Sequence, residues 1–590
     1  MAKTIQIKEH YKDSTINIVL DTLEMEKQAL VFCNSKRSAE KTAEDISYKV
    51  KKISDAEKRK LIELSEKVLN SLPKSTKQCE RLARCIKQGI AFHHAGLTMN
   101  QKTLVEDGFR EDVIKIISCT PTLAFGLDLP AFRVVIKNLG RYGPRGMQPI
   151  PVLEYHQMAG RAGRPGKTKW GEAITIASTE AGKEKIMEDF INADAEEIYS
   201  KLAVEPVLRS YILSLIATDF VRTRKQIMDF FNKTFWAHQF KDMYELMKKI
   251  NKMLILLEKF GFIESAKGKA EKLKQEKVSA GEKANKKSNK DNKIKEEKRD
   301  ICDEFLSADQ IYQEAAGLSA VETGFSSTET GFEDVEEKFT ATELGRRVSE
   351  LYIDPLTAYE IICGMKRSKT KHVLPISILQ MLCVTLEIRP KLRVKVKEYD
   401  EIIEQMVKYE SNMIVLEPSQ FDSEYDDYVN AFKTALFFND WIEENDEEFL
   451  LEKYDVRPGE IRAKLESANW LLYAAIELGK ILGVKNIGDK KKSMVAELTK
   501  IRLRMKYGVK EELLTLLKLK SIGRVRARKM HKFGIKDLGD IKKANIITLA
   551  QLVGKKTAIA IKDQVGEKVL EKDIKIKENK RKGQISLMDF

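Results

Sequence analysis

The chain has 590 residues, too many for one hydrophobic core, so we expect several domains. Its 104 Lys and Arg residues against 89 Asp and Glu residues suit a nucleic-acid partner, although a generally lysine-rich proteome would give the same balance. The sequence has no signal-peptide core and no long apolar run, which predicts a cytoplasmic protein without a membrane partner. It also has no C-x-x-C pair, which predicts free thiols and no metal site.

Strands and helices alternate through residues 1–200. The strand candidates are short and continuously apolar, which is typical of a parallel sheet covered on both faces. They are Ala29–Cys33, Gly89–His93, Val113–Cys119, Phe132–Lys137 and Ala173–Ala177. Such sheets bind ligands beyond the carboxyl ends of their strands, so the loops that follow these runs are the candidate sites.

The remaining chain divides by composition. Residues 201–263 have apolar positions at helical spacing and a short apolar end, which is compatible with a winged helix in a domain over 201–300. Residues 265–300 are rich in Lys and hold no aromatic residue, so we predict a disordered insertion. A helical domain over 301–500, a compact basic segment over 501–570 and a basic tail over 571–590 follow.

Two segments carry candidate phosphate chemistry. In the run Gln157–Gly166, Arg161 and Arg164 are three residues apart and would share a helix face among small residues. This is a way of presenting guanidinium groups to a triphosphate. The segment Thr120–Pro130 places hydroxyls and a glycine at a strand-to-helix turn, which suits phosphate or ribose and also suits an ordinary helix cap.

Four segments occur in a characteristic order: Asn34–Arg37, His93–Leu97, Thr120–Pro130 and Gln157–Arg164. In this order they resemble the second motor lobe of superfamily 2 helicases, and more narrowly the archaeal Hjm-type DNA repair helicases, relatives of the Ski-type helicases. The resemblance runs from about residue 15 to the C-terminus, apart from the insertion. It implies an α/β RecA-like lobe with a parallel sheet, followed by mostly α domains: a winged helix, a helical ratchet domain and a helix-hairpin-helix domain.

The resemblance also assigns roles to single residues. Gln157, Arg161 and Arg164 match the motif whose arginines reach the γ-phosphate, and they are the predicted catalytic residues. The predicted nucleotide contacts are Thr122, Gly126 and Asp128, although the family commonly has Asn where this chain has Asp128. Thr120, Asn34, Ser35 and Arg37 are expected on DNA.

Gly and Pro residues form the tip between two apolar arms over Ile136–Val152, which predicts a hairpin. In the family this hairpin is the wedge that splits the duplex, and Arg141, Tyr142 and Met147 would contact DNA there. A plain surface hairpin is the alternative interpretation.

Two later segments also resemble DNA-binding elements of the family. Trp470 fits the tryptophan that stacks on bases inside the family's ring of domains, with Arg462 or Lys464 as its basic companion; a buried core tryptophan is the alternative. Two glycine-centred repeats predict paired helix-hairpin-helix elements, or a purely structural hairpin. Their predicted DNA contacts are Gly523, Arg524, Arg526, Gly554 and Lys555.

The last seven residues have the pattern Gln-x-x-Leu-x-x-Phe, at Gln584, Leu587 and Phe590. This pattern looks like a peptide that docks on a sliding clamp. We therefore expect a clamp as a possible partner, together with single-stranded and forked DNA.

No G-x-x-x-x-G-K-[ST] loop occurs in the sequence. We therefore interpret the chain as the C-terminal portion of a nucleoid-associated, ATP-dependent 3′-to-5′ DNA helicase for replication-fork repair and recombination. On this interpretation a separate first-lobe subunit would hold most of the ATP and Mg²⁺, and the chain alone would be inactive. A non-catalytic, clamp-tethered DNA-binding adaptor and a truncated gene product are the alternatives.

Overall fold

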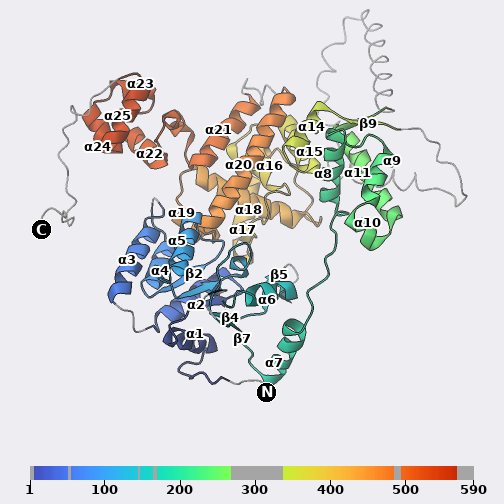
Figure 1. Cartoon of the computed structure of the whole chain (residues 1–590). Coiled ribbons are helices and arrows are strands. Elements are labelled where there is room, and N and C mark those ends of the chain that lie inside the picture. The colour runs from blue at the N-terminus through green and yellow to red at the C-terminus, as the bar shows by residue number, and fades with distance from the viewer. Residues whose placement is uncertain are drawn as a thin grey trace, which may run out of the picture. The chain divides into compact units, whose positions relative to one another are not determined.

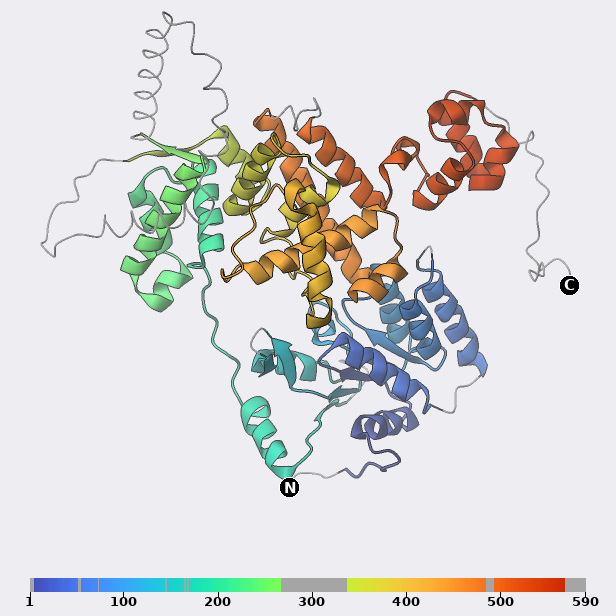
Figure 2. The same cartoon turned by 180° about the vertical axis from the view of Figure 1, so that it is seen from behind.

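The structure is a computed structural model. It describes residues 5–50, 55–72, 74–143, 146–163, 166, 169–266, 337–483 and 493–567. The chain divides into two compact units: Met1–Ile198 with Asp446–Lys464, and Tyr199–Asn445 with Leu465–Phe590. Figures 1 and 2 show the elements from two opposite sides.

A five-stranded parallel sheet lies at the centre of the first unit. Its strands are β1 (Ala29–Phe32), β2 (Ile90–His93), β3 (Ile116–Cys119), β4 (Arg133–Ile136) and β7 (Glu172–Thr175), in the order β2-β3-β1-β4-β7. Every residue of the first four is buried, which explains why they are mostly apolar in sequence rather than alternating. The prediction of a parallel sheet from five apolar runs is confirmed.

Helices surround this sheet in the first unit (Figure 1). Four of them begin at a hydroxyl N-cap: Ser35, Thr76, Thr98 and Thr179 each accept a hydrogen bond from a first-turn amide of α2, α4, α5 or α7. The described helices of this unit are α1 (Ser14–Glu24), α2 (Lys36–Ser47), α3 (Asp55–Leu69), α4 (Lys77–Ile86), α5 (Met99–Arg110), η1 (Pro121–Leu123), α6 (Val152–Ala159), α7 (Glu180–Ile186), the π-helical η2 (Met187–Ile191) and α19 (Glu447–Tyr454), followed by the start of α20 (Pro458–Ile481).

The predicted hairpin is present between β4 and α6. Strands β5 (Gly140–Gly143) and β6 (Gly146–Pro149) pair antiparallel, with Tyr142 opposite Met147. Met147 is 56% exposed, so its side chain is available to solvent.

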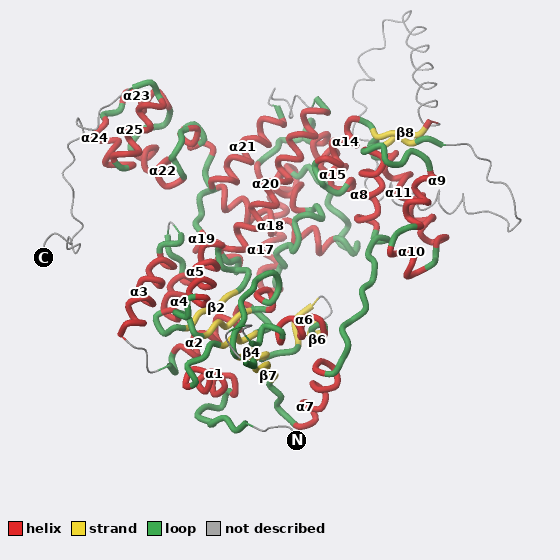
Figure 3. Tube along the Cα trace, viewed as in Figure 1, coloured by secondary structure: helices red, strands yellow, loops and turns green. Residues whose placement is uncertain are grey.

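The second unit begins with four helices and a two-stranded antiparallel sheet (Figure 3). A capping box at Thr223, closed by Gln226, starts the second helix. These elements are α8 (Glu205–Ala217), α9 (Arg224–Asn232), α10 (Phe235–Phe240), α11 (Met243–Lys259), β8 (Ile263–Ser265) and β9 (Phe339–Ala341). All but the first two residues of the predicted insertion 265–300 lie outside the described residues.

Helices make up the rest of the second unit. Arg209 of α8 forms a buried two-pronged ion pair with Asp354, which caps α15, and so joins the first helices to those that follow. The elements are α14 (Glu343–Glu350), α15 (Pro355–Arg367), α16 (Pro375–Cys383), η4 (Val396–Glu398), α17 (Tyr399–Tyr409), η5 (Glu410–Asn412), α18 (Tyr425–Ile442), the later part of α20, α21 (Met494–Tyr507), η6 (Glu511–Leu513), η7 (Leu516–Lys518), α22 (Arg524–Lys532), α23 (Leu538–Lys543), α24 (Ile546–Val553) and α25 (Lys555–Gln564).

Two composition-based expectations can be compared with this fold. The cysteines in the described part of the chain are free and buried. Among the described helices, none has the length and apolar character that crossing a bilayer requires.

Candidate functional site

The loops that follow β1, β2 and β3 lie at one edge of the sheet, because these strands are parallel neighbours. The amide of Thr120, after β3, donates to the carbonyl oxygen of His93 at the end of β2 (3.2 Å). The hydroxyls of Thr120 and Thr122 are 2.9 Å apart, and Thr122 is exposed. The structure therefore brings together the loops that the sequence analysis selected.

Arg161 lies against the loop after β3. Its Nη2 donates to the carbonyl oxygen of Ala124 at 2.6 Å, and its Nη1 is 3.8 Å from Oδ1 of the exposed Asp128. The carbonyl oxygen of Arg161 in turn accepts from the amide of Ala131 (3.0 Å). The guanidinium is thus held beside a loop that offers an exposed hydroxyl and Gly126, whose φ is +81° and beside which a side chain would meet open space. Such a donor set suits phosphate or ribose oxygens.

Helix α6 carries Gln157 and leads directly to Arg161. Its N-cap, Pro151, offers no side-chain acceptor, and the carboxylate of Glu196 accepts from the amides of Val152 (2.5 Å) and Leu153 (3.1 Å) instead. The hydrogen bond from Val152 is the main reason why the pKa of Glu196 is lowered. Sequence reasoning missed Glu196, because nothing local marks a cap that lies more than forty residues away along the chain.

The same helix is tied to the hairpin. Arg141, on β5, forms a 2.8 Å ion pair with Glu154, whose side chain is nearly buried. Glu154 and Gln157 lie on one helix, so the predicted wedge and the predicted nucleotide residues share one rigid support. Arg141 remains a predicted DNA contact, with its guanidinium engaged by Glu154 in this structure.

Gln157 has a feature that suits a ligand. Its side-chain Oε1 is buried and has no hydrogen-bond partner. Buried polar atoms are normally paired, so this amide is a candidate for contact with a bound group.

The two histidines after β2 are paired with carboxylates. His93 Nε2 is 2.9 Å from Glu106, and His94 Nε2 is 3.1 Å from Glu40. In the described part of the chain, no group of three or more His, Cys, Asp or Glu residues could hold a metal ion.

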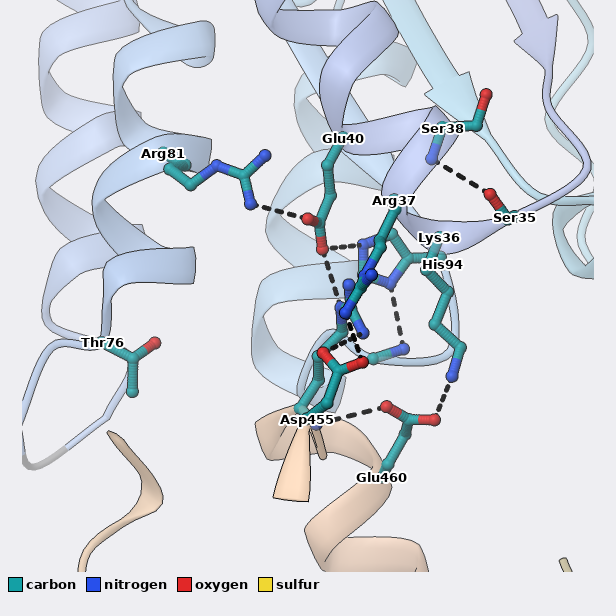
Figure 4. A network of polar contacts seen from close by, with 12 residues as sticks. Ser35, Lys36, Arg37, Ser38, Glu40, Thr76, Arg81, His94, Asp455 and Glu460 are labelled. Carbon is teal, nitrogen blue, oxygen red and sulfur yellow. Dashed lines mark hydrogen bonds and ion pairs between the residues drawn. The ribbon is translucent and has the colours of Figure 1, made fainter. Parts of the chain in front are cut away.

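The residues after β1 face the segment Asp446–Lys464 (Figure 4). Ser35 caps α2, and Arg37 pairs with Asp455 at 2.6 Å. Asn34 is half-buried. These three stay predicted DNA contacts, although the guanidinium of Arg37 is occupied by a carboxylate in the structure.

The predicted DNA contacts of the second unit have varied surroundings. Trp470 is half-buried and its Nε1 donates to the carbonyl oxygen of Leu351 (3.2 Å), while Arg462 is exposed. Arg524 lies over the ring of Trp441, 4.9 Å from its centroid, and Arg526 donates to the carbonyl oxygen of Ser521. Gly523 caps α22, and Gly554, with φ +91°, separates α24 from α25, which begins at Lys555.

Four predicted site residues lie outside the described residues. They are Arg164 of the arginine run and Gln584, Leu587 and Phe590 of the terminal pattern.

Three family models match the chain. They are the helicase conserved C-terminal domain over residues 59–166, a helix-turn-helix domain over residues 171–264, and domain 4 of archaeal helicases over residues 376–508.

Relatives match almost the whole chain. The ATP-dependent DNA helicase Hel308 of Methanococcus vannielii is 36% identical over 93% of this chain and 68% of the relative. The chain belongs to the Hel308 family. The Hel308 proteins of Methanocella arvoryzae and Pyrococcus abyssi are 34% and 33% identical, over 94% and 96% of this chain and 65% and 67% of their own lengths. The chain thus spans about two thirds of the length of these relatives.

These alignments correct the interpretation of the chain as a lobe-less portion that depends on a first-lobe subunit. The relatives carry the matching sequence within one polypeptide that is named a helicase, and 93% to 97% of this chain aligns with them. Nothing in these alignments points to a second subunit. The expectation that the chain alone is inactive is wrong for the same reason, and the assignment of ATP and Mg²⁺ to a separate first lobe has no support in these alignments.

Proposed function

We propose that the chain acts as an ATP-dependent DNA helicase. Family membership supports this proposal, and one observation carries it: Arg161 is fixed against the loop after β3 at the edge of a parallel sheet. A guanidinium in this position can neutralise charge that develops on a transferring phosphoryl group. We further infer that the protein works on DNA in the cytoplasm, at the nucleoid.

We assign the nucleotide to the group formed by Gln157, Arg161 and Arg164 with Thr122, Gly126 and Asp128. The unpartnered amide of Gln157 and the exposed hydroxyl of Thr122 support this assignment. We propose Mg²⁺ as the phosphate-bound companion of the nucleotide.

We assign DNA to surfaces of both units. In the first unit these are Asn34, Ser35, Arg37 and Thr120 after the strands, and the hairpin with Arg141, Tyr142 and Met147. In the second unit we propose a winged helix over 201–300, a ratchet domain over 301–500 with Arg462 and Trp470, and a helix-hairpin-helix domain over 501–570. The exposure of Met147 and Arg462, and the open backbone at Gly554, support these roles. Docking of the terminal tail 571–590 on a sliding clamp stays a prediction from its sequence.

Hydrolysis of ATP by the purified chain, with and without single-stranded DNA, tests the proposal. We expect DNA to stimulate hydrolysis and Arg161→Ala to abolish the stimulated rate. Arg110→Ala is the matched control, because Arg110 is exposed and, among the residues that the structure describes, pairs with two carboxylates of its own helix. No DNA-stimulated hydrolysis by the unmodified chain would contradict the proposal.

A further inference from the structure

The first unit includes a segment from far along the chain, Asp446–Lys464, which we call the docked segment. It contains α19 and the first two turns of α20. Lys74, just before α4, pairs with Asp446, the N-cap of α19, at 2.6 Å, and Lys77, the first residue of α4, pairs with Glu448 and Glu452 of α19. The acidic residues of α19 therefore lie against the lysines at the start of α4.

A buried ionic cluster holds the docked segment between α19 and α20 (Figure 4). The Nε of Arg457 donates to Glu40 Oε1 at 2.8 Å, and Arg81 donates to Glu40 Oε2 at 2.7 Å. Glu40 and His94 are almost completely buried, and Arg457 is 7% exposed. A buried carboxylate that loses such a partner is strongly disfavoured, so this contact specifies one docked geometry.

The main chains of the docked segment and of the loop after β2 also meet beside this cluster. The amide of Gly459 donates to the carbonyl oxygen of Gly96 (3.0 Å). A Cβ on Gly459 would lie 2.2 Å from the carbonyl oxygen of Leu97, and a Cβ on Gly96 would lie 2.4 Å from Cδ of Arg457. Glycine at position 459 thus allows this approach of two main chains, and glycine at position 96 leaves room for the side chain of Arg457.

Two further ion pairs reach the docked segment from the first turn of α2. Lys36 pairs with Glu460, and Arg37 pairs with Asp455. Ser35, the cap of α2, directly precedes them. The helix that follows β1 is thus linked to the start of α20.

We propose that the docked segment is a clamp between the sheet unit and α20, with Arg457 as its positioning residue. The functional role of the clamp rests on the proposed helicase function. Helix α20 carries Trp470, the predicted base contact, about 18 Å along the helix from its first residue. When the sheet unit moves during ATP hydrolysis, the clamp transmits that movement through α20 to Trp470. Arg37 is then a clamp residue rather than only a DNA contact.

Hydrogen–deuterium exchange of the full chain tests the clamp without any need for activity. We expect Arg457→Ala to increase amide exchange in residues 455–464 by about tenfold, through local opening, and to leave α15 unchanged. Arg84→Ala is the control, because Arg84 is exposed on the same helix as Arg81. Unchanged exchange in residues 455–464 of Arg457→Ala would overturn the clamp.

Exchange of the charges of Lys36 and Glu460 provides a second test if Arg457→Ala fails to fold. Lys36→Glu and Glu460→Lys should each increase exchange in residues 455–464, and the double variant should restore protection. The two side chains are about one-third and one-quarter exposed, so reversal is sterically tolerated. A double variant whose increase in exchange equals the sum of the two single increases would contradict a direct contact.

The coupling role needs a second measurement, the number of base pairs separated per ATP hydrolysed. We expect Arg457→Ala to reduce this ratio by about tenfold while DNA-stimulated hydrolysis changes about twofold or less. A parallel loss of both activities would overturn the coupling role. Increased exchange, combined with an unmodified chain that hydrolyses no ATP, would instead refute the helicase function and leave the docked geometry intact.

Discussion

The guanidinium of Arg161 donates to the carbonyl oxygen of Ala124, 37 residues earlier in the chain, at 2.6 Å. This bond joins the segment after α6 to the loop after β3. It leaves Arg161 at the carboxyl edge of the sheet, with a side chain that is 23% exposed. The proposed nucleotide role depends on this placement.

Replacement of Arg161 should separate chemistry from DNA binding. We expect Arg161→Ala to lower the DNA-stimulated rate of ATP hydrolysis by about 10³-fold or more, as loss of an arginine that stabilises a transferring phosphate does. Affinity for single-stranded DNA, measured by fluorescence anisotropy, should change little. Arg161→Lys should rescue little, because an ammonium lacks the planar, widely spaced donors with which the guanidinium can contact the Ala124 carbonyl and a phosphate in a fixed geometry. Equal losses of affinity and rate would contradict the assignment.

Stability should fall in mildly acidic solution because of His94. Burial lowers the pKa of His94, and Glu40 only partly offsets this effect. The unfolded chain therefore binds a proton more readily, and the free energy of unfolding should decrease as the pH falls below about 6.5. Denaturant titrations of His94→Gln should show a flatter profile in this range. His10→Gln, at an exposed position, should keep the slope of the unmodified chain.

Glu40 extends this acid sensitivity to lower pH. Burial raises its pKa, but hydrogen bonds from His94 and Arg457 outweigh burial and hold the pKa well below its ordinary value. Its stabilising contribution is present above the unfolded-state pKa and is lost as the pH falls below about 4.5. Glu40→Gln should remove this second decline. An unchanged decline in that variant would show that other carboxylates cause it.

Trp470 offers a test of base stacking. We expect Trp470→Ala to weaken binding of single-stranded DNA by about 1–3 kcal/mol. Trp470→Phe keeps an aromatic face but loses the bond from Nε1 to the carbonyl of Leu351, so it should lower stability by roughly 1 kcal/mol and preserve most of the affinity. If both variants lose stability and neither loses affinity, Trp470 is a core residue, the alternative that the sequence left open.

Arg526 and Arg528 form a matched pair on α22. Arg526 is exposed and donates to the main-chain oxygen of Ser521, whereas Arg528 is held by Glu444 and Glu512. We expect Arg526→Ala to reduce the slope of log affinity for DNA against log salt concentration by about 1. Arg528→Ala should lower stability and leave the slope unchanged. The reverse pattern would contradict a phosphate contact at Arg526.

Local patterns predicted much of the first unit. The strands were predictable because buried parallel strands are continuously apolar, as in Ala29–Phe32, and the hairpin because glycines bound its strands. The meeting of the loops after β1, β2 and β3 at one edge was predictable from a parallel sheet, whereas the bond between Arg161 and Ala124 is seen only in the folded chain. The docked segment could not be predicted. Glu40 and Arg457 are 417 residues apart, and Pro458 and Gly459 look like an ordinary helix start. Only the folded chain shows that the two glycines at positions 96 and 459 meet.

Strand separation by the purified chain tests the central claim most directly. A forked duplex with a labelled strand is incubated with the chain and either ATP or a non-hydrolysable analogue, and the same assay is run with Arg161→Ala. The account predicts separation that requires ATP hydrolysis and is lost in Arg161→Ala. Separation of equal extent with the analogue, or an Arg161→Ala variant as active as the unmodified chain, would contradict it.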